Sequence, residues 1–211
     1  MGGLPAPHTP PMKLGKVVKS NSHCDYVVQL DDGLDVALPP DPEDYGFGCF
    51  VKLEGDRHWA VGMVYNSQLF NPMFLNNGPR LSSEPDPFFT PDLISETRTL
   101  LGTVLIGSLV AEDGQLFGRQ GIPRTVVPVN TPVLRMTAAE IHQFHRDAEG
   151  RPQFRYYSLL LRYGGSFASH LTEQVLQELQ EMALFEPHEQ RALQTLCKEL
   201  AWRNTMGSLK L

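Results

Sequence analysis

The only close pair of histidines in the sequence is His142 and His145. Positions three apart on a helix share a face, so both imidazoles could bind one metal ion. A complete site would need further ligands, for which Asp147 or Glu149 is available. The alternative is that both histidines are solvent-exposed near the C-terminal end of a helix, where a protonated histidine is mildly favoured. We favour this alternative and predict no metal site.

The serines and cysteines form no arrangement typical of a nucleophilic or redox centre. Residues 165–169 read Gly-Ser-Phe-Ala-Ser and do not fit the Gly-x-Ser-x-Gly pattern of a nucleophile elbow. Cys24, Cys49 and Cys197 are far apart and form no Cys-x-x-Cys pair. They are expected to be small buried apolar residues, and they favour a reducing compartment. We therefore predict no catalytic residue, no cofactor and no enzymatic activity.

Arginines make the second half of the chain locally basic, and aromatic residues interleave with the last of them. This pattern could line a surface for single-stranded nucleic acid, although it is more often a solvated face over a core. The net charge of −6 argues against binding to a phosphate backbone. Nucleic acid is therefore a second candidate partner and not the favoured one. The residues are Arg119, Arg124, Arg135, Arg146, Arg151, Arg155 and Arg162, with Phe154, Tyr156, Tyr157 and Tyr163.

The elements that position these side chains begin with short strands between residues 14 and 65, which predict a small β-barrel. In residues 26–30, alternate side chains share one face. Asp31-Asp32-Gly33 favours a two-residue hairpin turn, and the alternation resumes in residues 34–38. Two prolines at positions 39 and 40 then end the predicted hairpin, because proline has no N–H to donate.

Two further strands are predicted over residues 48–54 and 59–65. In the second, small residues at Ala60 and Gly62 indicate the close approach of a neighbouring strand or a tight bend. Residues 100–110 predict a buried strand, bent at a glycine, and a strand restarts at 116–117. The proline-spaced segment 123–134 is typical of an edge strand leaving the barrel. One face of 59–65 holds Trp59, Val61, Met63 and Tyr65, and the other holds Ala60, Gly62 and Val64.

These strands resemble the HAS barrel, the N-terminal domain shared by HerA-type hexameric ATPases and rotary ATP synthase subunits. The shared pattern is a strand with an early glycine, a Gly-x-Phe/Tyr-Val-Lys strand and a Val-Gly-x-Val strand. Residues 14–18, 46–54 and 60–66 carry it here, and residues 105–109 and 122–133 fit the closing strands and the exit. The resemblance covers the chain from Lys13 to Met136.

The resemblance does not extend to nucleotide hydrolysis. HerA-like proteins carry a phosphate-binding Gly-x-x-x-x-Gly-Lys-Ser/Thr loop after the barrel, and the sequence contains none. About 75 residues follow the barrel, too few for an ATPase core of ordinary domain size. Because this barrel helps to hold subunits together in the resembled families, the resemblance implies self-association or docking to a protein partner such as an ATPase complex. A nucleic-acid-binding accessory factor of HerA-type DNA processing and a metal-dependent enzyme are the alternatives.

The predicted fold class is mainly β plus α. A disordered tail over 1–12 precedes a six-stranded barrel over 13–136, and a helical region over 137–211 ends in an antiparallel helical hairpin. The barrel contains a long loop insertion at 66–98 whose apolar residues either cap a barrel mouth, which we favour, or dock a partner. They are Leu69, Phe70, Met73, Phe74, Leu75, Phe88 and Phe89.

The helical region begins at a capping box, Thr137 to Glu140, with a helix expected to about Arg146. Residues 154–163 fit a helix or a short strand. The hairpin is predicted from a helix over 168–184 and a second one that starts at Pro187 and ends at Gly207. The first has an apolar stripe of Leu171, Val175, Leu176, Leu179, Met182 and Ala183, and a polar face of Glu173, Gln177, Glu178, Gln180 and Glu181; the second has Leu193, Leu196, Cys197 and Leu200.

The sequence shows no signal-peptide pattern at its start and no apolar run long enough to span a membrane. We therefore expect a soluble protein in the cytoplasm that does not insert into membranes.

Overall fold

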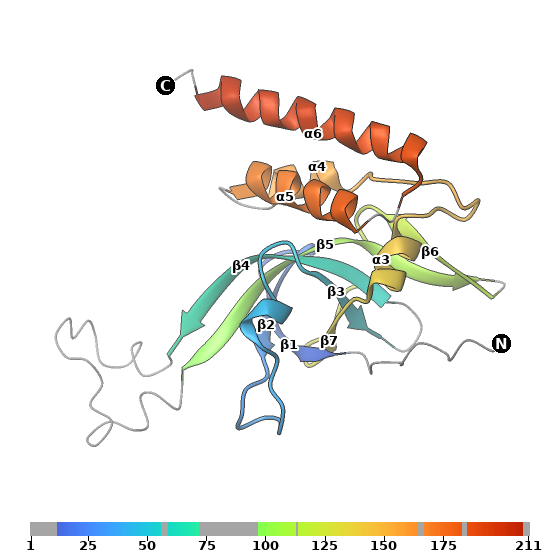
Figure 1. Ribbon diagram of the computed structural model, residues 1–211. Helices are drawn as coiled ribbons and strands as arrows, with labels where there is room; N and C mark the ends of the chain where they lie inside the picture. Colours follow the sequence, from blue (N-terminus) through green and yellow to red (C-terminus); the bar gives the residue numbers. More distant parts are fainter. Residues whose placement is uncertain are drawn as a thin grey trace, which may run out of the picture.

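The computed structural model describes residues 12–55, 59–71, 97–112, 114–163, 167–182 and 185–208. The chain forms a closed six-stranded antiparallel β-barrel with one extra strand, followed by several helices (Figure 1). This confirms the predicted fold class. The strands are β1 (Lys13–Ser20), β2 (Asp25–Leu30), β3 (Phe50–Glu54), β4 (Trp59–Phe70), β5 (Arg98–Glu112), β6 (Gln115–Gln120) and β7 (Pro132–Arg135).

The barrel closes in the order β1, β7, β3, β4, β5, β2, with β2 pairing back to β1. Strand β5 is shared by three neighbours. It pairs with β4 along most of its length, with β2 near its start and with β6 near its end. Strand β6 therefore lies outside the barrel and extends the sheet toward the helices.

Strand alternation separates two hydrophobic cores, as the pattern of residues 59–65 predicts. Ala60 and Val64 face the barrel interior, whereas Val61 and Met63 face a second core between the barrel and the helices. The predicted close approach at Gly62 is confirmed. A Cβ atom there would lie 2.6 Å from Cγ2 of a neighbouring-strand threonine, so the position excludes larger side chains.

The predicted hairpin through residues 31–33 is wrong. The partners of β2 are β1 and β5, which occupy both of its edges and leave no room for a strand over 34–38. Instead the Asp32 carboxylate accepts a hydrogen bond from the Leu34 N–H at 2.8 Å and turns the chain outward. Arg98 pairs with Asp32 and holds this turn against the start of β5. Leu34 and Leu38 are consequently exposed.

The strand predicted to end at Tyr65 continues to Phe70, because its outer part pairs with the first residues of β5. This two-stranded arm projects from the barrel (Figure 1), and its β4 side chains are exposed because pairing satisfies the backbone without burying them. Leu69 and Phe70 lie on the arm and not over a barrel mouth. The rest of the predicted loop, 72–96, and the predicted tail up to residue 11 lie outside the described residues.

The predicted edge strand is also corrected. Most of the proline-spaced segment is irregular, and only β7 is a strand there. It pairs with β1 on one side and with β3 on the other, so it is a central strand that closes the barrel. Pro132 stands at its first position, where a strand tolerates a missing N–H.

The helices are the short 3-10 helix η1 (Pro42–Asp44), α3 (Ala138–Phe144), α4 (Tyr157–Tyr163), α5 (Ala168–Glu181) and α6 (Pro187–Ser208). Helices α4, α5 and α6 stack over one side of the barrel, and α5 and α6 form the predicted antiparallel hairpin (Figure 1). Residues 157–163 are thus helical. The predicted stripe of α5 is buried from Leu171 to Leu179, but Met182 is exposed. In α6, Leu193 is buried.

Helix α3 begins at the predicted capping box and ends at Phe144, slightly earlier than expected. The Glu140 carboxylate accepts a hydrogen bond from the Thr137 N–H at 2.8 Å and forms an ion pair with the buried Lys52 at 2.7 Å. Burial alone would raise the pKa of Glu140, but the hydrogen bonds from Lys52 and Thr137 outweigh it and lower this pKa. Glu140 therefore caps α3 and fixes it to β3.

Replacing Thr137 by alanine is expected to lower the free energy of unfolding by about 1 kcal/mol, because the Glu140 N–H loses its side-chain acceptor. Urea denaturation followed by circular dichroism measures this change. Thr137→Ser keeps the hydroxyl and should lose much less stability. Equal losses in the two variants would contradict the capping role.

Candidate binding cleft between the barrel and the helices

The predicted histidine pair does not form a shared site. His145 is completely buried, and its Nδ1 lies 2.7 Å from the Ile141 carbonyl while its Nε2 lies 2.8 Å from the Tyr156 hydroxyl. Both ring nitrogens are thus occupied. The expectation that both histidines are solvent-exposed is wrong for His145, which is a core residue. The described residues contain no group of three or more His, Cys, Asp or Glu side chains placed to bind a metal ion.

The interleaved arginines and aromatic residues do not form one basic surface. Tyr156 is buried, so its ring is not available for stacking with bases, whereas Phe154 is partly buried and Tyr157 is exposed. Four of the seven arginines are neutralised by carboxylates. The pairs are Arg119 with Glu112, Arg135 with Asp44, Arg146 with Glu189, and Arg151 with Asp147.

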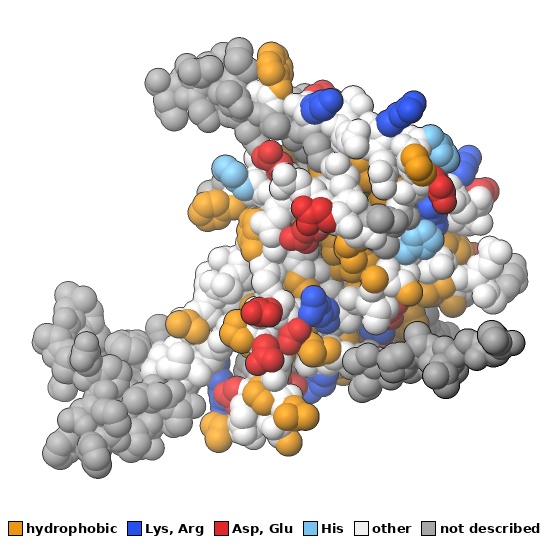
Figure 2. Space-filling model, viewed as in Figure 1, with side chains coloured by type: hydrophobic (Ala, Val, Ile, Leu, Met, Phe, Trp, Pro, Cys, Tyr) orange, Lys and Arg blue, Asp and Glu red, His pale blue; other side chains and the backbone are white. Residues whose placement is uncertain are grey.

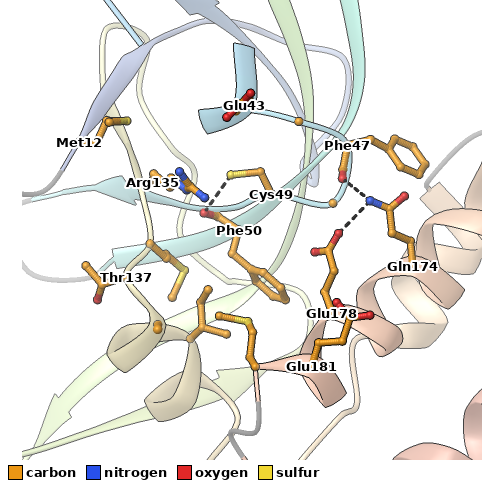
Figure 3. A pocket seen from close by; sticks show the side chains of 16 residues that line it. Met12, Glu43, Phe47, Cys49, Phe50, Arg135, Thr137, Gln174, Glu178 and Glu181 are labelled. Atoms are coloured by element: carbon orange, nitrogen blue, oxygen red, sulfur yellow. Dashed lines mark hydrogen bonds between the residues drawn. The ribbon is translucent and has the colours of Figure 1, made fainter. Parts of the chain in front are cut away.

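An open cleft of about 880 Å³ lies between the barrel and helix α5. It is bordered by the connection from η1 to β3, by the end of β7 with the start of α3, and by the C-terminal half of α5 (Figure 3). The cleft therefore opens at the seam between the two layers of the fold. Its apolar lining comes from Met12, Phe47, Phe50, Met136, Ile141 and Met182.

Helix α5 presents one polar stripe to the cleft. Gln174, Glu178 and Glu181 line it, and their spacing places them along one side of the helix, while the apolar Met182 follows at its end. The Gln174 amide donates to the Phe47 carbonyl at 3.0 Å and to the Glu178 carboxylate at 2.9 Å. These bonds hold α5 at the η1–β3 connection, and Figure 3 shows both of them.

A glycine forms the turn at which the barrel contacts α5. Gly48 has a φ of 90°, a left-handed conformation that disfavours other residues. A Cβ atom at Gly48 would lie 3.4 Å from the Val175 side chain on α5, an ordinary van der Waals contact, so the backbone conformation and not the available space favours glycine. The turn before β3 therefore fits under the helix and shapes the wall of the cleft.

Carboxylates stand on both sides of the cleft. Glu43 lies on η1, and Glu178 and Glu181 lie on α5 across from it (Figure 3). Within the described residues, no Lys, Arg or His side chain forms an ion pair with these three carboxylates. Arg135, the cation among the described residues that line the cleft, is paired with Asp44 at 2.7 Å. On the face in Figure 2, acidic side chains lie on the helical layer and on the barrel, with apolar side chains between.

The cleft also holds the thiol of Cys49, whose Sγ lies 3.3 Å from the Asp44 carbonyl. Burial raises the pKa of Cys49 to about 11, with Glu178 and Asp44 adding to the rise against the opposing effect of Arg135. The residue therefore remains a neutral thiol at physiological pH and is a weak nucleophile. Cys24 is buried, as predicted, and Cys49 is half-buried.

Sequence reasoning assigned Glu178 and Glu181 to the solvated face of a helix and gave Glu43 no role. About 130 residues separate the two walls of the cleft, and no local spacing connects them. One feature of the sequence could have indicated an acidic surface on this helix: its polar face carries glutamate without any lysine or arginine.

The fold defines the class of the protein as a small β-barrel with a helical layer, and an open cleft lies at the seam between the two. None of the described helices combines the length and apolar character that crossing a membrane requires. Residues 6–210 match the model of a domain of unknown function, DUF8166, so the chain belongs to this family. No curated protein matches the chain.

Proposed function

We propose that this chain is a non-catalytic interaction protein of the cytoplasm, built on a HAS-like barrel, that binds a protein partner such as an ATPase complex at the cleft. The observation that carries this proposal is an apolar cleft at the seam of the fold that no part of the described chain covers. Met12 and Met182 are exposed at the cleft, by 41% and 39%. An uncovered apolar surface rimmed by polar groups marks a site of association.

The chemistry of the cleft favours binding over catalysis. Its thiol has a raised pKa and donates to backbone carbonyls, which opposes nucleophilic attack. Its methionine side chains are flexible and polarisable, and such residues are common where a protein accommodates a partner's side chains. The pairing of four arginines gives the nucleic-acid alternative no support.

Photo-crosslinking from the cleft tests this proposal. A benzophenone amino acid in place of Met182 is expected to crosslink a protein in the native host, because that side chain faces the cleft opening. The same probe in place of Leu38, which is 90% exposed on the distant turn after β2, serves as the control. A product specific to position 182, identified by mass spectrometry, supports the proposal.

Light scattering after size exclusion complements the crosslinking. A complex or a self-associated species should be present with the unmodified chain and absent when the cleft is altered by Met182→Glu. The proposal is wrong if the chain is strictly monomeric and if position 182 gives no more crosslinking than position 38.

A further inference from the structure

We infer that the occupant of the cleft is an amphipathic helix of a partner protein that carries lysine or arginine beside its apolar face. This inference rests on the proposed function and specifies the chemistry of the partner. It depends on three features of the cleft: its apolar lining, its carboxylates that form no ion pair with a described residue, and the fully paired strands beside it.

The apolar lining provides a place for anchor side chains. Phe50, Met136 and Ile141 are buried residues that reach the cleft from the core, and Met182 stands exposed above them at the end of α5. A volume of about 880 Å³ accommodates several side chains of one inserted segment but not a folded domain. The partner should therefore present a few apolar anchors from one continuous segment.

The charges select the sign of the flanking residues. Glu43 approaches from the barrel side, whereas Glu178 and Glu181 approach from α5, so negative charge borders the cleft on two walls. Arg135 is already neutralised by Asp44. Clefts lined by one sign of charge attract the opposite sign and repel the same sign. The net charge of −6 acts in the same direction.

The paired strands favour a helix over an extended segment. Strand β3 pairs with both β4 and β7, and β7 pairs with both β3 and β1. Neither strand bordering the cleft has a free edge, so an added strand would leave its own N–H and C=O groups without partners. A helix satisfies its backbone internally. Its basic residues, three or four positions apart, could then pair with Glu178 and Glu181 along α5.

The test uses the full chain and a synthetic leucine–lysine peptide in amphipathic helical order, with binding followed by fluorescence anisotropy. There are two control peptides. One has the same composition in scrambled order, and the other keeps the order but has glutamate in place of every lysine. The amphipathic basic peptide should bind, and higher salt should weaken its binding. The double variant Glu178→Gln/Glu181→Gln should lower its affinity about tenfold at low salt.

A matched variant controls for net charge. Glu186→Gln/Glu199→Gln removes the same charge from two exposed positions that do not line the cleft, and it should bind the peptide as the unmodified chain does. Met182→Ser should weaken binding without changing its dependence on salt. Circular dichroism verifies that each variant is folded.

Three results would overturn the inference. The first is that both double variants bind the basic peptide equally well. The second is that the scrambled or the glutamate peptide binds as tightly as the amphipathic basic peptide. The third is a self-associated species that the cleft substitutions dissociate, because a second copy would then be the occupant. Crosslinking at position 182 distinguishes these cases: a second copy gives a crosslinked dimer, a partner of different chemistry gives a product with another protein, and the absence of any partner gives no specific product.

Discussion

Replacing Gly118 by alanine is expected to lower the free energy of unfolding by about 3 kcal/mol or more. A Cβ atom at this position of β6 would lie 2.0 Å from the Phe144 carbonyl oxygen, far inside any real contact. The neighbour is backbone at the end of α3 and cannot move away by rotating a side chain. Either β6 or the end of α3 must therefore be displaced.

The displacement would break the connection between the two layers. The Gly118 N–H donates to the Arg146 carbonyl at 2.9 Å, and the Gln153 amide donates to the Gly118 carbonyl at 2.6 Å. These bonds occupy the outer edge of β6 and hold the segment between α3 and α4 on the barrel. We expect Gly118→Ala to weaken peptide binding at the cleft as well, since α3 forms part of its wall.

Urea denaturation followed by circular dichroism measures the effect. Gly33→Ala is the matched control, because a Cβ atom there meets nothing within 4 Å. It should change the free energy of unfolding by no more than about 0.5 kcal/mol. A Gly118→Ala variant as stable as Gly33→Ala would show that the close contact between β6 and α3 is not formed in solution.

The barrel and the helical hairpin could be predicted because their signals are local. Alternation over residues 59–65 assigned each side chain to the correct core, and the Thr137 capping box marked the start of α3. The stripe on α5 gave its buried face from Leu171 to Leu179. In each case the period of the apolar residues matches the period of the element that buries them.

The errors came from long-range competition. Asp31-Asp32-Gly33 is a good turn sequence, but β2 gains more by pairing with β1 and β5 than with the residues that follow the turn. His145 was expected to be exposed because spacing alone cannot show that Tyr156, directly before α4, contacts its ring. The cleft was not predictable from spacing, since its walls come from η1 and α5.

The buried His145 leads to a prediction for the pH dependence of stability. Burial lowers the pKa of this imidazole to about 4, against an opposing hydrogen bond to the Ile141 carbonyl and with small additional effects of His142 and Arg146. Nδ1 donates to that carbonyl, so Nε2 accepts the hydrogen bond from the Tyr156 hydroxyl. Protonation of Nε2 would remove this acceptor inside a core of aromatic rings.

The sign of the effect follows from the two states. In the unfolded chain the pKa of a histidine is near its ordinary value of about 6.5, so as the pH falls the unfolded state binds a proton before the folded state does. The stability that His145 contributes is therefore fully present above about pH 6.5 and is lost as the pH falls toward 4. The loss amounts to about 3 kcal/mol and levels off below that range.

Comparison with His145→Gln isolates this contribution from the titration of carboxylates. Glutamine does not titrate and can still accept a hydrogen bond from the Tyr156 hydroxyl. Urea denaturation of both proteins from pH 7.5 to 4 should show that the unmodified chain loses about 3 kcal/mol more than the variant. Parallel curves would mean that His145 is accessible to solvent and that the core joining α3, α4 and the barrel is open in solution.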